Sequence, residues 1–245
     1  LIAQWLATAV GIWLLLRVFS LSALLSGLRD TQVWLLSAFK HLIAINGFIF
    51  VRTILLMLAF SLIMRVAGQL GEIEMAASHV VLQYLMLISL GLDGFAHAAE
   101  ALAGSAWGNN NTADFRRWVR LTGIWAFLAS MVYTVGFGLG GEAITAALTN
   151  IGAVRDAVAS IMPIVTALPL VAVACYQFDG VYIGATAAPA MLGTMAVAFA
   201  VYLLALQPLT LAYGFTGLWA AVLIFMATRG LAQAIWYPRL LSRLR

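Results

Sequence analysis

The sequence predicts an all-α polytopic membrane protein with about seven transmembrane helices, six of which form one bundle. The first observation is composition: 64% of the 245 residues are hydrophobic and 9% are charged, whereas a soluble domain has about 45–50% apolar and about 25% charged residues. The second is that the few charges lie at the ends of long apolar runs. This distribution is typical of membrane topology, so the net charge of +4 does not indicate a nucleic-acid partner.

The first apolar run covers residues 1–16 and ends at Arg17, slightly short of the about 20 residues that a span needs. We expect a transmembrane helix that begins before this sequence or is just complete. Residues 17–46 form the most polar long connection. Within them, residues 33–45 place apolar side chains around Lys40 and are too short to span, which suits the membrane surface. The segment is predicted to be a cytoplasmic linker with an interfacial helix.

Six further runs are long enough to cross a bilayer, and they define a transmembrane lobe over residues 47–238. We predict spans at about 47–70, 76–107, 121–141, 157–178, 190–212 and 216–236. Residues 142–156 mix charged and aliphatic side chains and are expected to form a short surface helix. Pro163 and Pro169 predict a kink in the fourth of these spans, where it lines a cavity.

Three arginines interrupt the predicted spans. Their long side chains allow the charge to reach the membrane surface while the stem stays in the hydrocarbon. Arg52 and Arg65 are expected to extend toward opposite headgroup layers, and Arg229 toward the basic tail at residues 239–245. The alternative for Arg65 is an inward orientation in which it pairs with a carboxylate.

Basic residues are concentrated in alternate connections. Nine of them lie in the linker 17–46, the loop 109–120 and the tail 239–245, whereas the other side has Arg155 and, at its border, Arg65. The positive-inside rule places the basic side and the C-terminus in the cytoplasm. We therefore expect a multi-pass protein of the plasma membrane, the inner membrane of the cell.

The most informative stretch is 91–108, which is apolar or small apart from a few polar side chains that include Asp93, His97 and Glu100. The spacing of the two carboxylates places them on one face of a helix, roughly 10 Å apart along its axis, with His97 between them. Charged groups at membrane depth are costly and usually face a bundle interior or an aqueous cavity. The stretch is therefore predicted to line an ion or substrate path. The alternative is that the carboxylates hold helices together or lie near the headgroups.

A second candidate pair lies farther along the chain. Asp179 comes at the end of an apolar run, and Tyr176 precedes it by three residues. A carboxylate at that depth suits the same ion path, and the tyrosine hydroxyl can hydrogen-bond to an ion or to the carboxylate. The alternative for Tyr176 is an anchor at the membrane interface.

No enzyme chemistry is predicted. The sequence has no His-Glu-x-x-His zinc motif, no phosphate-binding loop that ends in Gly-Lys-Ser/Thr, and no Gly-x-Ser-x-Gly nucleophile elbow. His97 and Glu100 lack the further ligands that a metal site needs, and the single cysteine, Cys175, cannot form an internal disulfide. We expect no catalytic residue, no bound metal and no cofactor other than a coupling ion.

Several segments resemble the MATE (multidrug and toxic compound extrusion) transporters, particularly their DNA-damage-inducible protein F branch. Residues 92–104, followed by Phe115-Arg-Arg-Trp-Val-Arg120, are similar to the eighth helix and the next cytoplasmic loop of that family. Residues 178–186 resemble its tenth helix, and residues 50–57 its seventh. The resemblance covers about 47–238, nearly the whole chain.

The resemblance implies a full protein of roughly twelve helices in two pseudo-symmetric lobes. This chain then looks like the C-terminal lobe, with residues 1–16 as the last helix of a missing N-terminal lobe. It also implies export of organic, often cationic or amphipathic compounds by alternating access, driven by proton or sodium entry. The partners are then the lipid bilayer, small organic substrates, and either the missing lobe or a second copy of the chain.

In the family, carboxylates of either lobe bind the coupling cation, and the matching positions here are Asp93, Glu100 and Asp179. His97 and Tyr176 complete the predicted cavity. Some sodium-coupled relatives carry a glutamate in the seventh helix, but residues 53–64 have none, which favours protons.

Two alternatives remain. One is a flippase of lipid-linked oligosaccharides from the same superfamily, for which more basic residues in the cavity are expected, to bind pyrophosphate. Arg52 and Arg65 are the candidates for such residues. The other alternative is an inactive truncated lobe.

Overall fold

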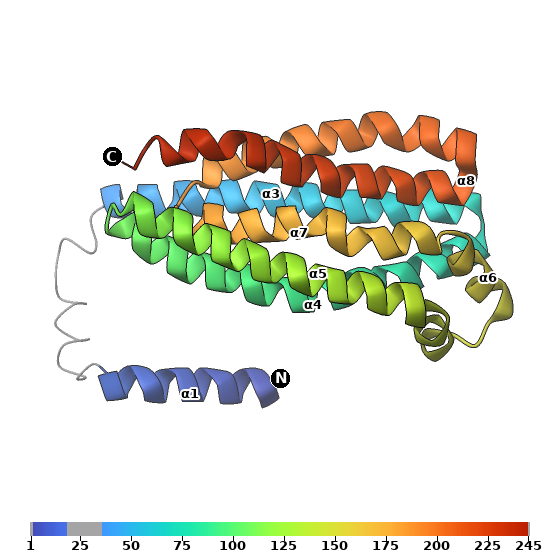
Figure 1. Cartoon of the computed structure of the whole chain (residues 1–245), viewed down its shortest axis with the longest axis horizontal. Coiled ribbons are helices and arrows are strands. Elements are labelled where there is room, and N and C mark those ends of the chain that lie inside the picture. Colours follow the sequence, from blue (N-terminus) through green and yellow to red (C-terminus); the bar gives the residue numbers. More distant parts are fainter. Residues whose placement is uncertain (1, 19–35, 245) are drawn as a thin grey trace. The chain divides into compact units, whose positions relative to one another are not determined.

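The computed structural model describes residues 2–18 and 36–244, and over these ranges the secondary structure is helical, without strands (Figure 1). The all-α prediction is confirmed. The helices, in chain order, are α1 (Ile2–Val18), α3 (Leu36–Leu70), α4 (Glu72–Gly108), α5 (Thr112–Leu148), α6 (Gly152–Ser160), α7 (Met162–Gly184) and α8 (Ala188–Leu241).

The chain divides into two compact units, Leu1–Asn46 and Gly47–Arg245. In the first unit, the predicted span at residues 1–16 corresponds to α1, which has 17 residues. Most of the predicted linker lies outside the described residues. The described part of the predicted interfacial helix is continuous with α3 rather than separate from it, because no proline lies between Leu36 and Leu70. Its place on the membrane surface stays a prediction.

In the second unit, the helices are long and apolar. Five helices of the described chain are long and apolar enough to cross a membrane: Ile43–Leu70, Glu72–Gly108, Thr112–Leu148, Met162–Gly184 and Ala188–Leu241. The last contains two crossings, because Gly214 has φ 56° and ψ −129° and the chain reverses there (Figure 1). A side chain is disfavoured at that positive φ, so glycine permits the turn. The six predicted spans of the lobe are thus present as α3, α4, α5, α7 and the two legs of α8.

The connections at helix ends follow local capping chemistry. At the start of α5, the Asn111 side chain accepts a hydrogen bond of 3.1 Å from the backbone N–H of Asp114, which is a normal N-cap. At its other end, α5 continues to Leu148, and only the nine residues of α6 form a short separate helix. The predicted surface helix at 142–156 therefore had the wrong boundaries. The helix continues past the exposed Glu142 because its backbone hydrogen bonds remain satisfied there.

The two prolines of α7 have different roles. Pro163 lies in the first turn, where a missing N–H costs little, so it initiates the helix and does not kink it. Pro169 lies inside the helix, as predicted, and leaves a backbone carbonyl of the preceding turn without its normal donor.

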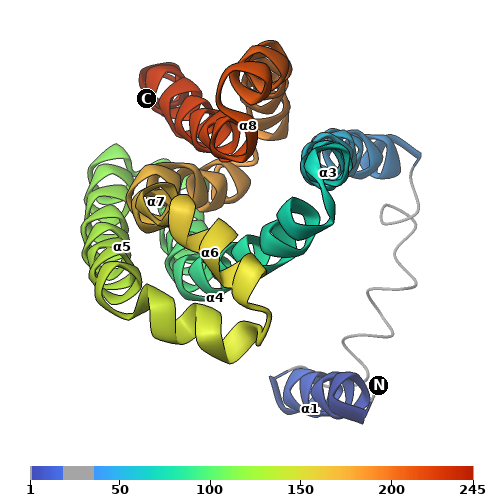
Figure 2. The ribbon, with the colours of Figure 1, turned by 90° about the vertical axis from the view of Figure 1, so that its right-hand side faces the viewer.

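The backbones of α4 and α7 pack closely against each other. A Cβ atom added to Gly180 would lie 2.0 Å from the carbonyl oxygen of Ala96, and one added to Gly184 would lie 2.5 Å from that of Glu100. Glycine is therefore required at both positions, and the two helices approach more closely than larger residues allow. In Figure 2, viewed along the helices, α4, α5 and α7 lie close together, while α3 stands farther from them.

Candidate functional site

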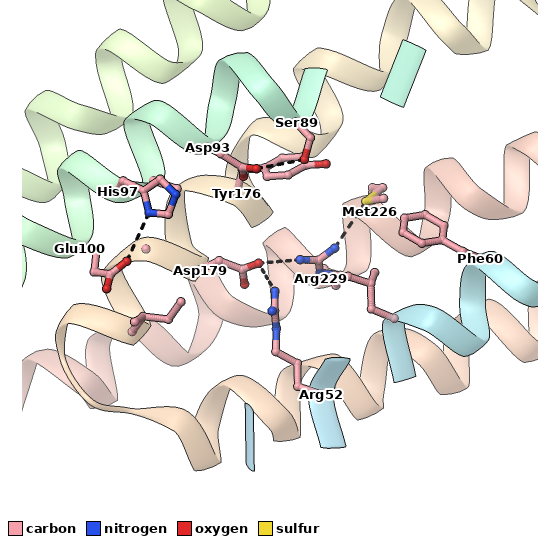
Figure 3. A pocket seen from close by; sticks show the side chains of 14 residues that line it. Arg52, Phe60, Ser89, Asp93, His97, Glu100, Tyr176, Asp179, Met226 and Arg229 are labelled. Atoms are coloured by element: carbon pink, nitrogen blue, oxygen red, sulfur yellow. Dashed lines mark hydrogen bonds and ion pairs between the residues drawn. The ribbon is translucent and has the colours of Figure 1, made fainter. Parts of the chain in front are cut away.

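The close α4–α7 packing places the sequence-predicted residues around one hollow. A cavity of about 300 Å³ lies between α3, α4, α7 and the second leg of α8 (Figure 3). All five predicted site residues line it: Asp93, His97, Glu100, Tyr176 and Asp179. The remaining lining residues are Arg52, Leu56, Phe60, Ser89, Ala96, Gly180, Ile183, Met226 and Arg229.

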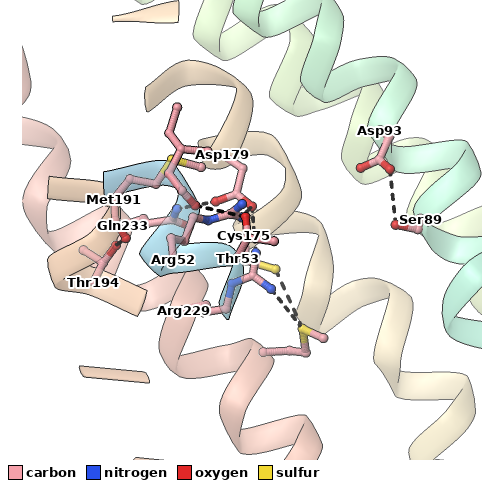
Figure 4. Close-up of polar contacts among 12 residues, drawn as sticks. Arg52, Thr53, Ser89, Asp93, Cys175, Asp179, Met191, Thr194, Arg229 and Gln233 are labelled. Carbon is pink, nitrogen blue, oxygen red and sulfur yellow. Dashed lines mark hydrogen bonds and ion pairs between the residues drawn. The ribbon is translucent and has the colours of Figure 1, made fainter. Parts of the chain in front are cut away.

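Asp179 is at the centre of a polar network that joins three helices (Figure 4). Its Oδ2 accepts hydrogen bonds from Nη2 of Arg229, at 2.7 Å, and from Nη2 of Arg52. Its Oδ1 accepts from Nε2 of Gln233, at 2.7 Å. The Asp179 and Arg52 side chains are each 14% exposed, and Arg229 is 5% exposed. One arginine of α3 and one of α8 are therefore both held by a single carboxylate of α7.

The two arginines correct the sequence analysis. Arg52 and Arg229 were expected to extend toward the membrane surface, and both expectations are wrong, because each guanidinium instead turns inward to Asp179. A buried carboxylate loses its hydration, and two cationic hydrogen-bond donors compensate that loss. The arginines would have avoided their own desolvation by contacting the headgroups. Arg65 makes no ion pair among the described residues, so its predicted alternative of pairing with a carboxylate has no support in this part of the chain.

The carboxylates of α4 have weaker partners. Oδ2 of Asp93 accepts from the Ser89 hydroxyl at 3.2 Å, and Oε2 of Glu100 lies 3.5 Å from Nδ1 of His97. The His97 and Glu100 side chains are 78% and 41% exposed. No arginine or lysine of the described ranges pairs with either carboxylate. Figure 4 shows the Asp93–Ser89 pair away from the Asp179 network.

The cavity is thus divided by charge. On the α7 and α8 side, two arginines share the single carboxylate of Asp179, which leaves one net positive charge, while on the α4 side neither Asp93 nor Glu100 forms an ion pair with an arginine or lysine of the described residues. Tyr176 lies beside the Ser89–Asp93 pair, with its ring in the cavity wall (Figure 3). This arrangement suits a cation that approaches α4, with aromatic surface from Tyr176 and Phe60 to contact an organic group.

Sequence reasoning missed three members of the network. Arg229 and Arg52 were assigned to the surface, and Gln233 was not considered. The available signal was the isolation of Arg229, because residues 180–228 contain no charge at all. A lone charge in such a stretch needs a buried partner for the same reason that a carboxylate does. In the described part of the chain, no group of three His, Cys, Asp or Glu residues is arranged to hold a metal ion.

Comparisons with known proteins agree with this architecture. A model of the MatE family matches residues 49–209. DNA damage-inducible protein F of Escherichia coli (strain K12) is 36% identical over 241 residues, which are 96% of this chain and 51% of that protein. Protein DETOXIFICATION 42 of Arabidopsis thaliana is 27% identical over 196 residues, which are 78% of this chain and 37% of that protein. The chain therefore spans about half the length of the bacterial relative, and less of the plant one.

Solved structures share this fold. One of them is that of a MOP superfamily transporter from Pyrococcus furiosus Vc1 (DSM3638), for which a binding pocket of reverse polarity suggests a different function. The TM-score is 0.67 at 15% sequence identity, over 76% of this chain and 44% of that one.

Proposed function

The chain belongs to the MatE family, whose members are transporters and not enzymes, and from this premise we propose that it forms half of a cation-coupled antiporter. The exported substrates are organic, cationic or amphipathic compounds. The single observation that supports this proposal best is the pair of carboxylates Asp93 and Glu100, which form no ion pair with a described arginine or lysine, in a cavity of about 300 Å³ whose wall includes Tyr176 and Phe60.

Exchange follows from one site with two exclusive occupants. A carboxylate at Asp93 binds either a coupling cation or a cationic substrate, so entry of one displaces the other. The proton is favoured over sodium, because residues 53–64 lack the glutamate of sodium-coupled relatives. Glu100 adds negative charge with His97 beside it, and Tyr176 supplies a hydroxyl and a ring. Asp179 supports the cavity by pairing with both arginines of its wall.

The second half of the transport path comes from outside this chain. The lobe spans 51% of its bacterial relative, and its cavity is walled by α3, α4, α7 and α8 alone. We propose that an N-terminal lobe or a second copy of the chain closes it for alternating access. The protein lies in the plasma membrane, the inner membrane of the cell, with its C-terminus in the cytoplasm, since the basic ends of α5 and α8 share one end of the bundle (Figure 1).

Ethidium accumulation tests the proposal. The protein is expressed in cells without multidrug exporters, by itself and beside a MATE N-terminal lobe. We expect lower ethidium accumulation in at least one arrangement, with the effect abolished by a protonophore and unchanged by removal of sodium. Asp93→Asn removes most of the efflux, whereas the control Asp156→Asn, which changes an exposed carboxylate on α6, leaves it intact. Equal efflux by both variants contradicts the assignment, and efflux in neither arrangement contradicts the function.

A second candidate is a flippase of lipid-linked oligosaccharides. It is favoured by Arg52 and Arg229, two guanidinium groups in the cavity wall that suit a pyrophosphate. Translocation of a fluorescent polyprenyl-pyrophosphate lipid in proteoliposomes distinguishes the two functions. Flipping that is lost in Arg52→Gln and independent of a pH gradient supports the flippase, whereas ethidium efflux without flipping supports the antiporter.

A further inference from the structure

A second polar cavity lies between α3 and the first leg of α8, away from the Asp179 network. It has a volume of about 320 Å³. Its polar lining residues are Arg65 and Gln69 from α3, with Gln207 and Thr210 from α8, and the apolar ones are Leu62, Val66, Leu206 and Leu211. Each polar pair is spaced by four or three residues, so its two side chains lie on the same face of their helix.

Two polar groups of this cavity, on Arg65 and Thr210, lack partners among the described residues. Arg65 makes no ion pair with any carboxylate of the described ranges, including Glu72 and Glu74 at the start of the next helix. The Thr210 hydroxyl oxygen is buried and has no hydrogen-bond partner among the described residues. A buried hydroxyl without a partner is costly, and the exposed Arg65 has no described carboxylate to pair with, which together indicate a ligand with acceptor oxygens.

The depth of the cavity fits the headgroup layer of a bilayer. Arg65 lies five residues before the end of α3 at Leu70, and Thr210 lies four before the break at Gly214. At about 1.5 Å per residue, both are roughly 6–8 Å inside the ends of their helices. Toward the membrane centre, the same faces continue with the exposed side chains of Leu58 and Leu203, which are 47% and 46% exposed. The polar cavity is thus continued toward the membrane centre by an exposed apolar surface.

We propose that this cavity binds the phosphate of a phospholipid headgroup, with the acyl chains along Leu58 and Leu203. Arg65 provides the charge-assisted hydrogen bonds, and the Gln69 and Gln207 amides and the Thr210 hydroxyl provide further donors. The lipid bridges α3 and α8 at the end of the bundle opposite the Arg52–Asp179 contact. This binding site is independent of the transport function proposed above.

Native mass spectrometry of the detergent-purified protein tests this site. The probe is 1-palmitoyl-2-oleoyl-phosphatidylglycerol. We expect Arg65→Gln to weaken its binding about tenfold, which corresponds to about 1.4 kcal/mol. Gln207→Leu and Thr210→Val are expected to weaken it about threefold each, and they keep the test informative if Arg65→Gln is poorly folded. The control Arg155→Gln, which removes an arginine of α6 outside this cavity, leaves binding unchanged.

Two ligand controls identify the recognised group. Dioleoylglycerol, which has no phosphate, is expected to bind at least tenfold more weakly than the phospholipid, and so is glycerol 3-phosphate, which has no acyl chains. Equal binding of dioleoylglycerol overturns the role of the phosphate, and equal binding of glycerol 3-phosphate overturns the lipid as its source. Equal loss of binding in Arg65→Gln and Arg155→Gln reduces the effect to general surface charge and overturns the site.

Discussion

The Asp179 network predicts an unequal response to the loss of its members. Asp179→Asn removes the carboxylate that pairs with Arg229 and Arg52 in the described part of the chain, and it leaves two buried guanidinium groups facing each other. Loss of one partner from a buried ion pair costs about 3–5 kcal/mol, because the remaining charge stays desolvated. Since about 1 kcal/mol shifts the melting temperature of a chain of this size by about 2–4 °C, the expected decrease is about 6–20 °C.

The complementary change is milder. Arg229→Met leaves Asp179 with Arg52 and Gln233, so no charge is stranded, and the expected cost is about 1–3 kcal/mol. The double variant Asp179→Asn with Arg229→Met strands only Arg52, and it should be more stable than Asp179→Asn alone. Such non-additivity is the signature of direct coupling in a double-mutant cycle.

Thermal unfolding in detergent, followed by circular dichroism or by a thiol-reactive dye on the buried Cys175, measures these differences. The matched control is Asp93→Asn, since that carboxylate has the Ser89 hydroxyl as its hydrogen-bond partner and is half-buried. We expect it to change the melting temperature by no more than about 4 °C, which corresponds to about 1 kcal/mol. If Asp179→Asn is no more destabilising than Asp93→Asn, the network does not hold the three helices together.

Two further changes test the packing of the lobe. Gly180→Ala is expected to lower the melting temperature by several degrees, because its Cβ would lie 2.0 Å from the Ala96 carbonyl oxygen. The control Gly136→Ala has open space around it and should be neutral or stabilising by up to about 1 kcal/mol. Similar melting temperatures for both variants contradict the close approach of the two helices. Tyr84→Phe removes a buried hydroxyl that donates to the Gly141 carbonyl at 2.7 Å, and it is expected to cost about 1–3 kcal/mol of stability in the same assay. A stability equal to that of the wild type would contradict this contribution.

The sequence predicted the helices well because the bilayer imposes their length and composition. A span must satisfy its backbone internally and must contain about 20 apolar residues, so hydropathy alone locates it. The reversal within α8 lies in an uncharged stretch, yet it was predicted from the local sequence. Gly214 is the residue that tolerates the backbone conformation of the turn. The predicted boundaries of α5 were less accurate. A helix continues beyond the hydrocarbon for as long as its backbone hydrogen bonds remain satisfied, and hydropathy does not show where that ends.

The candidate site was predicted in part. Asp93, His97 and Glu100 lie on one helix, so their common face follows from spacing alone. Their meeting with Asp179 depends on the approach of α4 to α7, and a single sequence does not specify helix pairing. The arginines were misplaced for the same reason: one helix does not reveal whether a long cationic side chain turns to a partner or to the headgroups. The Arg52–Asp179–Arg229 contacts depend on the tertiary packing of three helices.

The division of charge in the cavity has a consequence for coupling. A carboxylate that already accepts from two guanidinium groups and an amide has little capacity left for a cationic substrate, so Asp179 is poorly suited to exchange ions. Asp93 has one weak hydroxyl donor and faces the same cavity. Stability and transport should therefore separate: Asp93→Asn loses efflux with a nearly unchanged melting temperature, while Asp179→Asn loses both through unfolding. If efflux persists in Asp93→Asn and disappears in a folded Asp179→Asn protein, the exchange site lies on α7, and the arginines must release Asp179 during the cycle.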